Sequence, residues 1–238
     1  MEPAIAETAA LFGDPVRAAM LTALLDRRVL SAGQLAFAAN VSPQTASFHL
    51  GKLSTAALIS GERQGRNQVY RLAGPEVANV IESLSAIAVA GSTGHSGNGH
   101  IRSERSRQLR MARTCYDHLA GVAGVLLHDA LMRAGYLVAP GPKAYKLTRA
   151  GEEWVSGLGL ADVLAGSRSP MARPCLDWSE RKPHLAGRLA AHLLDSFFRD
   201  GWIARIRDTR AVRITDRGLR QFERAYGLNL NGGHSEAL

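Results

Sequence analysis

The chain has 238 residues, of which 46% are hydrophobic and 21% charged, a composition typical of a globular protein that excludes a disordered or collagen-like chain. Lys and Arg outnumber Asp and Glu by 29 to 21, and the net charge of +8 favours an anionic partner such as nucleic acid. The two cysteines exclude a disulfide framework. With no basic leader and no long apolar stretch, we expect a cytoplasmic protein and no membrane partner.

Capping motifs predict the starts of three helices in the first part of the chain. Asp14-Pro15 supplies an N-cap acceptor followed by proline, Ser31–Gln34 has the capping-box spacing, and Ser42-Pro43 begins a third helix after a tight turn. The apolar spacing predicts which residues of these helices face the core. They are Val16, Met20, Ala23 and Leu24 in the first helix, Leu35 and Ala38 in the second, and Ala46, Leu50, Leu53 and Ala57 in the third.

A β-hairpin and a long helix are predicted to follow. Ile59–Arg63 and Gln68–Leu72 read as short strands around a Gly-containing turn. Two short helices joined by a tight turn and followed by such a hairpin form the winged helix-turn-helix arrangement. The helix after Gly74-Pro75 carries more apolar residues than a small domain can cover, so we expect it to pack on a second subunit. These residues are Val77, Val80, Ile81, Leu84 and Ile87.

Residues 3–90 resemble the ArsR-type winged-helix transcriptional regulators. The resemblance implies a homodimer built largely by the first and last helices of the domain, with the second helix of the helix-turn-helix in the major groove and the wing beside the DNA backbone. It therefore implies a sequence-specific regulator of transcription, which we expect to be a repressor that responds to a ligand or a metal. The matching segments are Ala10–Arg17, Ser42–Leu50 and Gly65–Leu72.

The residues that carry metal sites in many members of this family are missing here. Gln34–Asn40, in the helix before the recognition turn, has no cysteine. Pro75–Ala90, in the last helix of the domain, has neither histidine nor aspartate. We therefore expect any sensing site to lie elsewhere in the chain.

The candidate DNA contacts are polar and basic residues of the recognition helix and the wing. Gln44 and Thr45 lie where base edges are read, and the wing arginines would follow the phosphates. Phe48 either meets a thymine methyl group or packs under the wing. Since residues 1–90 carry no net charge, the pattern alone supports DNA binding, and a winged helix used only for protein contacts is the alternative. The set is Ser42, Gln44, Thr45, Ser47, His49, Lys52, Arg63 and Arg66.

The rest of the chain divides by composition and internal repetition. Gly, Ser, His and Asn dominate the stretch after Ala90, which predicts a flexible linker whose histidines are solvated. Five arginines follow at short spacing and predict a solvated helix face or a phosphate contact: Arg102, Arg105, Arg107, Arg110 and Arg113. The predicted parts are a DNA-binding and dimerisation domain (1–90), the linker (91–110), a duplicated domain that senses an effector or stabilises the dimer (111–227), and a tail (228–238).

Residues 112–154 and 172–222 align as two repeats. Ala112–Asp117 matches Ala172–Asp177, and after a six-residue insertion His118–Gly121 matches His184–Gly187. Each repeat predicts a helix, a Gly-aromatic turn and a pair of strands, and the two are expected to pack about a pseudo-twofold axis. The predicted fold class is mainly α, with an N-terminal winged helix-turn-helix and a C-terminal α+β domain of two winged-helix-like repeats.

Both cysteines occupy equivalent positions in the repeats. On a helix, Cys115 and His118 would share a face, and contact between the repeats would add Cys175 and His184. The four would form a Cys2His2 site for a soft metal ion such as zinc, with Asp117 and Asp177 behind the ligands. Three alternatives stay open: buried structural residues copied by duplication, reactive thiols, or a pocket for an organic effector lined by Tyr116, Trp178 and Trp202.

Two alternative functions of the second domain follow from shorter motifs. The Cys175-x5-Arg181 spacing resembles that of low-molecular-weight phosphatases and arsenate reductases, but Asp177 and Glu180 would repel an anion in that loop, so we do not expect an enzyme. A second DNA-binding wing is the other alternative. It would use the arginines of the last strand pair: Arg205, Arg207, Arg210 and Arg213.

Overall fold

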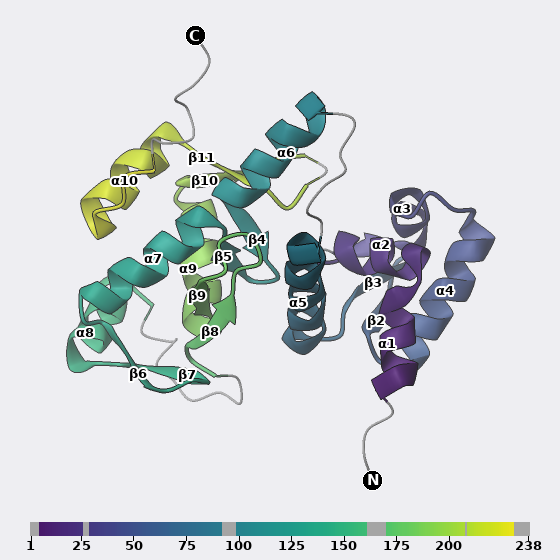
Figure 1. Ribbon diagram of the computed structural model, residues 1–238, viewed down its shortest axis with the longest axis horizontal. Coiled ribbons are helices and arrows are strands. Elements are labelled where there is room, and N and C mark those ends of the chain that lie inside the picture. Colours follow the sequence, from purple (N-terminus) through teal and green to yellow (C-terminus); the bar gives the residue numbers. More distant parts are fainter. Residues whose placement is uncertain (1–4, 26–28, 92–98, 161–169, 208, 231–238) are drawn as a thin grey trace. The chain divides into compact units, whose positions relative to one another are not determined.

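The chain folds into two compact units, Met1–Leu84 and Ser85–Leu238, and the division falls inside a helix (Figure 1). The computed structural model describes residues 5–25, 29–91, 99–160, 170–207 and 209–230. Within these ranges, no helix has both the length and the apolar character needed to span a bilayer.

Unit 1 (Met1–Leu84) begins with four helices, α1 (Ile5–Gly13), α2 (Pro15–Ala23), α3 (Ala32–Ala38) and α4 (Pro43–Thr55). The capping predictions are confirmed. The Asp14 carboxylate accepts from Arg17 N at 2.9 Å, and the Ser42 hydroxyl accepts from Thr45 N at 3.1 Å. Ser31 and Gln34 form the reciprocal capping box. Local sequence therefore sets where these helices begin.

The apolar faces of α2, α3 and α4 meet in the core of unit 1, mostly as predicted: Met20, Leu24, Leu35, Ala46, Leu50 and Leu53 are buried, and Val16 and Ala23 are half-buried. The predictions for Ala38 and Ala57 are wrong, because both are exposed. Ala38 ends α3, where Ala36 takes the inward position beside Leu35. Ala57 lies beyond the end of α4 with φ 53°, so the helical spacing no longer applies to it.

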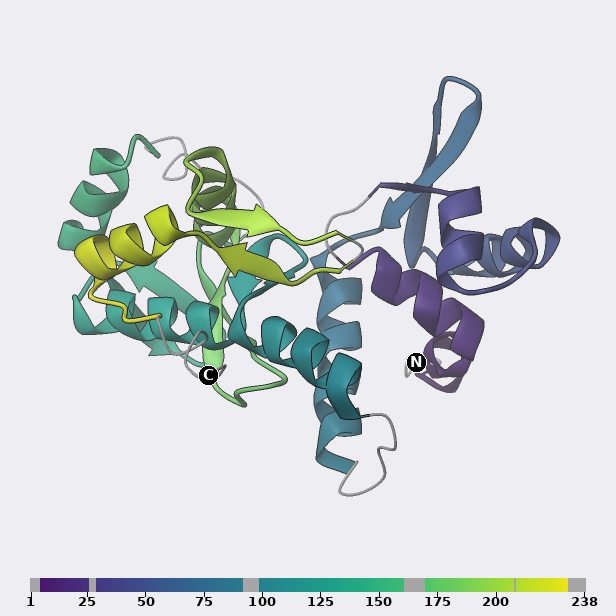
Figure 2. The same cartoon turned by 90° about the horizontal axis from the view of Figure 1, so that it is seen from above.

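A three-stranded antiparallel sheet completes the winged helix. Its order is β1 (Leu30–Ser31), β3 (Asn67–Leu72), β2 (Ile59–Gln64). The predicted hairpin is confirmed, with Gly65-Arg66 as a two-residue loop in which Gly65 has φ 61°. Figure 2 shows this hairpin extending beyond the helices of unit 1, as a wing does. Helix α5 (Pro75–Gly91) follows the sheet.

Unit 2 (Ser85–Leu238) contains two copies of one sequence of elements, hairpin, helix, hairpin, helix. After α6 (Gly99–Met111), the first copy comprises β4 (Arg113–Cys115), β5 (His118–Ala120), α7 (Val122–Arg133), β6 (Leu137–Gly141), β7 (Ala144–Leu147) and α8 (Arg149–Gly157). The second comprises β8 (Arg173–Leu176), β9 (Pro183–Ala186), α9 (Arg188–Arg199), β10 (Ile203–Arg205), β11 (Val212–Ile214) and α10 (Asp216–Tyr226). The repeats predicted from sequence thus have matching folds.

The two repeats of unit 2 exchange backbone contacts. Thr114 N, in the first hairpin, donates to Arg210 O of the second repeat at 2.9 Å. Reciprocally, Tyr145 N of the first repeat donates to Ala172 O of the second at 3.0 Å. Helix α7 also packs against β9, and α9 packs against β5. One apolar core therefore serves both repeats.

The last helix of each repeat depends on a Thr-x-x-Gly motif. Thr148 caps α8 by accepting from Gly151 N at 3.1 Å, and Thr215 caps α10 by accepting from Gly218 N at 2.9 Å. A Cβ atom at Gly151 would overlap Tyr136 O, and one at Gly218 would overlap Trp202 O. Glycine is required at both positions because the preceding backbone passes so close.

Several expectations for residues beyond Ala90 change with the structure. The prediction that Cys115 and His118 share a helix face is wrong, since they lie on the β4–β5 hairpin. Arg113, expected on a solvated helix face, is fully buried in β4. Where the structure describes the predicted linker (91–110), it is helical: Gly91 ends α5, and residues 99–110 belong to α6. Residues 92–98 lie outside the described residues. At the predicted tail, Leu228 and Leu230 are buried in the core of unit 2.

Candidate functional site

The outward face of α4 is polar and begins at the capped N-terminus of the helix. Gln44, Thr45 and Ser47 are exposed there, and Lys52 is exposed further along. The hydroxyls have local partners, since Ser42 Oγ lies 2.9 Å from Thr45 Oγ1 and Ser47 Oγ donates to Pro43 O at 3.0 Å. Gln44 and Lys52 are thus the long polar side chains on this face.

Phe48 lies on the same face and does not pack under the wing. Its side chain is 60% exposed, and Lys52 Nζ lies 4.4 Å from the centroid of its ring. The lysine stem and the aromatic ring therefore form a small amphipathic surface beside the polar groups.

His49 differs from the other candidate contacts of α4 because it turns inward. Its Nδ1 atom lies 3.6 Å from Asp14 Oδ1, and its side chain is 11% exposed. The backbone N–H of Arg17, together with the Arg17 and His49 charges, lowers the pKa of Asp14 against the opposing effect of burial. His49 thus joins α4 to the start of α2, which leaves it poorly placed for DNA.

The wing carries positive charge at its tip. Arg63 lies near the end of β2 and Arg66 lies in the loop, and both are exposed. Arg71, nearer the base of the hairpin, is 3.4 Å from Glu62 and is balanced by it. The cationic part of the wing is therefore its tip.

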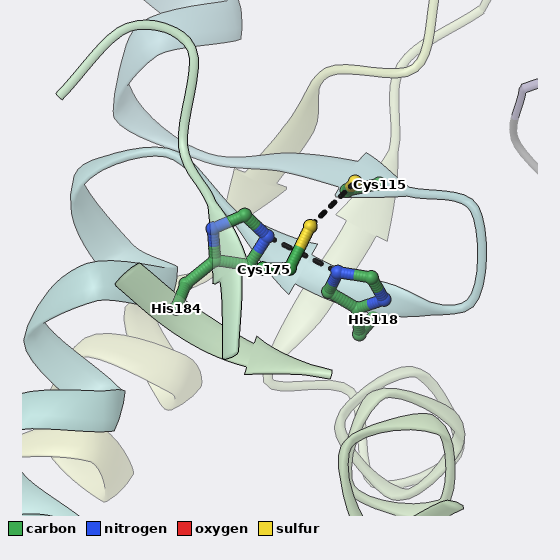
Figure 3. A group of neighbouring side chains, drawn as sticks. All are labelled: Cys115, His118, Cys175 and His184. Atoms are coloured by element: carbon green, nitrogen blue, oxygen red, sulfur yellow. Dashed lines mark hydrogen bonds between the residues drawn. The ribbon is translucent and has the colours of Figure 1, made fainter. Parts of the chain in front are cut away.

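A second candidate site lies in unit 2, where two hairpins bring both cysteines and two histidines together (Figure 3). Cys115 and His118 face each other across β4–β5, and Cys175 and His184 do so across β8–β9. The Sγ atoms are 3.9 Å apart and the two Nε2 atoms are 3.1 Å apart. All four side chains are buried, and their ligand atoms lie within 4.8 Å of one another.

A carboxylate lies near the Nδ1 atom of each histidine. Asp117 Oδ1 lies 3.0 Å from His118 Nδ1, and Asp177 Oδ2 lies 3.5 Å from His184 Nδ1. Asp177 is fully buried and pairs with the equally buried Arg113, whose Nη2 is 2.9 Å from Asp177 Oδ2. The imidazoles are thus oriented with their Nε2 atoms toward each other.

The charges of this cluster shift its pKa values in opposite directions. Burial disfavours the His118 cation, but Cys115 and Asp117 outweigh it and raise the pKa of His118 to about 9. Burial and the neighbouring His118 hold the pKa of His184 well below its ordinary value. Burial also opposes ionisation of Asp177, yet Arg113 holds the pKa of Asp177 well below its usual range. Charge is thus favoured on His118 and disfavoured on His184, and one hydrogen bond joins their Nε2 atoms at 3.1 Å.

The loop from Cys175 to Arg181 is not built to hold an oxyanion. Asp177 Oδ1 already accepts from Ser179 N at 2.9 Å and from Glu180 N at 3.1 Å. Cys175 is buried, whereas Arg181 is exposed. Phosphatase chemistry needs free backbone amides and an arginine beside the thiol. Here the amides of Ser179 and Glu180 bond to Asp177, and Arg181 is exposed to solvent.

The aromatic residues suggested for an effector pocket have separate partners. Trp178 stacks on Arg113, with Arg113 Cζ 4.6 Å from its ring centroid, and Trp202 stacks on Phe197 in the core with ring centroids 5.2 Å apart. Between β10 and β11, the backbone and side chain of Arg210 bond to Thr114. These contacts do not support the organic pocket. Arg210 contacts the first repeat, whereas Arg205, Arg207 and Arg213 are exposed, so the second DNA-binding wing stays a prediction.

Sequence reasoning missed the role of Arg113. In the sequence Arg113 continues the series of arginines before it, although it also belongs to the repeated segment Ala112–Asp117. Its place in the duplicated motif is the sequence signal that distinguishes Arg113 from the arginines expected to face solvent.

The chain matches known regulators in sequence. A family model described as a helix-turn-helix domain matches residues 12–62. The uncharacterized HTH-type transcriptional regulator YdfF of Bacillus subtilis (strain 168) is 43% identical over 231 residues, which cover 97% of this chain and 100% of YdfF.

Solved structures similar to part of the chain were also found. One is the homodimeric winged helix-turn-helix DNA-binding domain of Mb0332 from Mycobacterium bovis, a possible ArsR-family regulator, at 25% identity, covering 39% of this chain and 87% of that one, with a TM-score of 0.34. Another is the cadmium metal-sensor CMTR of Mycobacterium tuberculosis, at 29% identity, covering 40% of this chain and 98% of that one, with a TM-score of 0.32.

The match to YdfF along its whole length decides the family, and the capped helices with their wing agree with it. The chain belongs to the HTH-type transcriptional regulators, and its N-terminal part is a winged helix-turn-helix domain.

Proposed function

We propose that the protein binds specific sequences of double-stranded DNA as a homodimer, with α4 of each subunit in the major groove and the β2–β3 wing beside the backbone. The observation that carries this proposal is the exposed polar face of α4, capped at its N-terminus and accompanied by a cationic wing tip. The N-terminal residues of a recognition helix are those that reach base edges. Gln44 and Thr45 occupy that position.

Each candidate residue has a distinct role in this proposal. Gln44 reads adenine through its amide, Thr45 and Ser47 contact base edges or phosphates, and Ser42 holds the helix start. Lys52, Arg63 and Arg66 contact phosphates and set the register without reading sequence. His49 is left out because Asp14 holds it inside the domain.

The dimer is supported by apolar side chains exposed on α5. Val80 and Leu84 are exposed, and Ile87 is 69% exposed on the same helix. Large apolar side chains repeated along one helix mark a surface that another molecule covers. A second copy of the chain, related by a twofold axis, would present two recognition helices to a palindromic site.

We infer that the regulator represses transcription and that unit 2 carries the response to an effector. A dimer seated on promoter DNA excludes other proteins from that stretch, which supports repression. An effector that favours one dimer geometry changes the spacing of the recognition helices and so the fit to successive grooves. Deleting the gene of a repressor should raise expression from the bound promoter. If the protein were an activator, the same deletion would lower that expression.

The test of specific binding uses Gln44→Ala. On a duplex from the promoter of its own gene, the variant should lose about 1–3 kcal/mol of binding free energy and discriminate less at one base pair per half-site. Binding to random duplex should stay unchanged, as measured by fluorescence anisotropy.

The matched control is Thr55→Ala, at the far end of α4 on an exposed position. It should bind both duplexes like the original protein. An equal loss of affinity for promoter and random DNA in Gln44→Ala would contradict base reading by this residue. Absence of DNA binding by the original protein would favour the protein-contact alternative.

A further inference from the structure

The cluster in unit 2 combines four ligand-type side chains from two hairpins that lie far apart in the sequence. We propose that Cys115, His118, Cys175 and His184 bind one Zn²⁺ ion, with each repeat supplying one cysteine and one histidine. This proposal concerns unit 2 alone and is independent of how unit 1 contacts DNA.

The distances fit a tetrahedral zinc ion. Zn–S bonds of about 2.3 Å and Zn–N bonds of about 2.0–2.1 Å place the two sulfurs about 3.8 Å apart and the two nitrogens about 3.3 Å apart. The Sγ atoms of the cysteines are 3.9 Å apart, and the Nε2 atoms of the histidines are 3.1 Å apart. Since no two ligand atoms are more than 4.8 Å apart, small side-chain rotations bring all four to one ion.

The histidines are oriented as metal ligands are. Both present Nε2 to the centre of the cluster, and each Nδ1 faces a carboxylate, Asp117 at 3.0 Å and Asp177 at 3.5 Å. Metal-binding histidines commonly direct their other nitrogen to such a carboxylate, which fixes the ring and strengthens the ligand. The carboxylate–histidine–metal arrangement thus occurs twice, once in each repeat.

Burial of polar groups also favours an ion at the centre. Two imidazoles that face each other inside a protein share one hydrogen bond, and burying polar atoms costs free energy unless they are satisfied. His184 Nδ1 is buried without a hydrogen bond of good geometry. A dication bound to two thiolates and both Nε2 atoms satisfies the centre of the cluster and replaces the proton that they share.

The donor set and its enclosure indicate the kind of site. Two thiolates and two imidazoles in tetrahedral positions suit zinc, and four buried protein ligands leave no position for a substrate. The ion would tie β4–β5 of one repeat to β8–β9 of the other. It lies in neither helix segment where members of this family often hold metals, since Gln34–Asn40 has no cysteine and Pro75–Ala90 has no histidine or aspartate.

The first test is the metal content of the full-length protein purified under reducing conditions. We expect one zinc per chain by mass spectrometry of the metal. After removal of zinc, Co²⁺ should restore one equivalent with the visible absorption of a tetrahedral ion and a thiolate charge-transfer band. Cys115→Ser and His118→Ala should lose that spectrum, whereas His192→Ala, an exposed histidine of α9, should keep it.

The second test avoids the ligands themselves and compares two Asp–His pairs of similar geometry. Asp129 Oδ1 lies 3.1 Å from His128 Nδ1, outside the cluster, much as Asp117 lies 3.0 Å from His118 Nδ1. Asp117→Asn should weaken zinc binding by about 10- to 100-fold in competition with a chelator, and Asp129→Asn should leave it unchanged.

Three results would overturn the proposal. One is a reduced, folded protein that binds no zinc. Another is zinc bound equally well by Cys115→Ser, which would place the ion elsewhere. The third is a Cys115–Cys175 disulfide in protein isolated without reductant together with no zinc binding after reduction, which would make the pair a redox element.

Discussion

Replacing Lys52, Arg63 and Arg66 together by alanine should weaken binding to every duplex, specific or random. All three side chains are exposed, one on α4 and two near the tip of the wing, so their loss should not disturb the fold. Each phosphate contact contributes about 0.9 to the slope of log affinity against log salt, so a dimer that loses six contacts should lose about 5 from that slope. Between 50 and 200 mM salt, the original protein should therefore lose about 10³-fold more affinity than the variant.

The matched control removes the same charge from unit 2. Arg217, Arg220 and Arg224 are exposed on α10, and replacing all three by alanine lowers the net charge equally. This variant should keep the original slope in the same anisotropy titrations. If the triple variant of α4 and the wing kept the original slope as well, the assignment of this face to DNA would be wrong.

Arg113→Ala should destabilise unit 2 by about 3–5 kcal/mol, because it leaves a buried carboxylate without its cation. Arg113 and Asp177 are both fully buried and lie 2.9 Å apart. Arg113 also donates to Leu109 O in α6 and to Ser179 Oγ in the β8–β9 loop, each at 3.1 Å. Its loss therefore removes the hydrogen bonds that connect α6 to that loop. Since all three tryptophans lie in residues 85–238, urea unfolding followed by tryptophan fluorescence reports on this unit.

The repeat provides the control for this change. Arg173 occupies the position in β8 that Arg113 occupies in β4, but it is only half-buried. Arg173→Ala should cost about 1 kcal/mol or less. Equal and small effects at the two positions would show that the buried ion pair contributes little to the stability of unit 2.

The fold of unit 1 follows from local signals in its sequence. Asp14, Ser31 and Ser42 each cap a helix as predicted, because a short polar side chain before a helix satisfies an exposed backbone N–H regardless of distant packing. The exposure of Ala38 and Ala57 was not predictable in this way. The helical spacing was extended to the end of α3 and past the end of α4, where the chain no longer presents the same face.

The two hairpins that carry the cysteines, β4–β5 and β8–β9, lacked the usual sequence signals. The loop between β4 and β5 is Tyr116-Asp117, with no glycine, and Tyr116 adopts φ 60°, a value uncommon for a large side chain. Strands of three residues also leave too little alternation to distinguish them from a helix. The element type of Cys115 and His118 was therefore predicted wrongly.

The proximity of the cluster residues was nevertheless predictable from the duplication. When two copies of one fold pack reciprocally, equivalent residues near the contact meet, whatever element carries them. Cys115 and Cys175 meet for this reason, as do His118 and His184. Arg113 and Asp177 form their pair across the same contact, which no spacing within one repeat reveals.

The most direct test of the account is a hydroxyl-radical footprint of the full-length protein on promoter DNA from its own locus at low ionic strength. A dimer with one α4 in each of two successive major grooves should protect two half-sites related by a twofold axis, with centres about 34 Å or about 10 base pairs apart. Gln44→Ala should weaken both protected regions together. A single protected region, or none at a salt concentration where phosphate contacts are strongest, would contradict the placement of α4 on DNA.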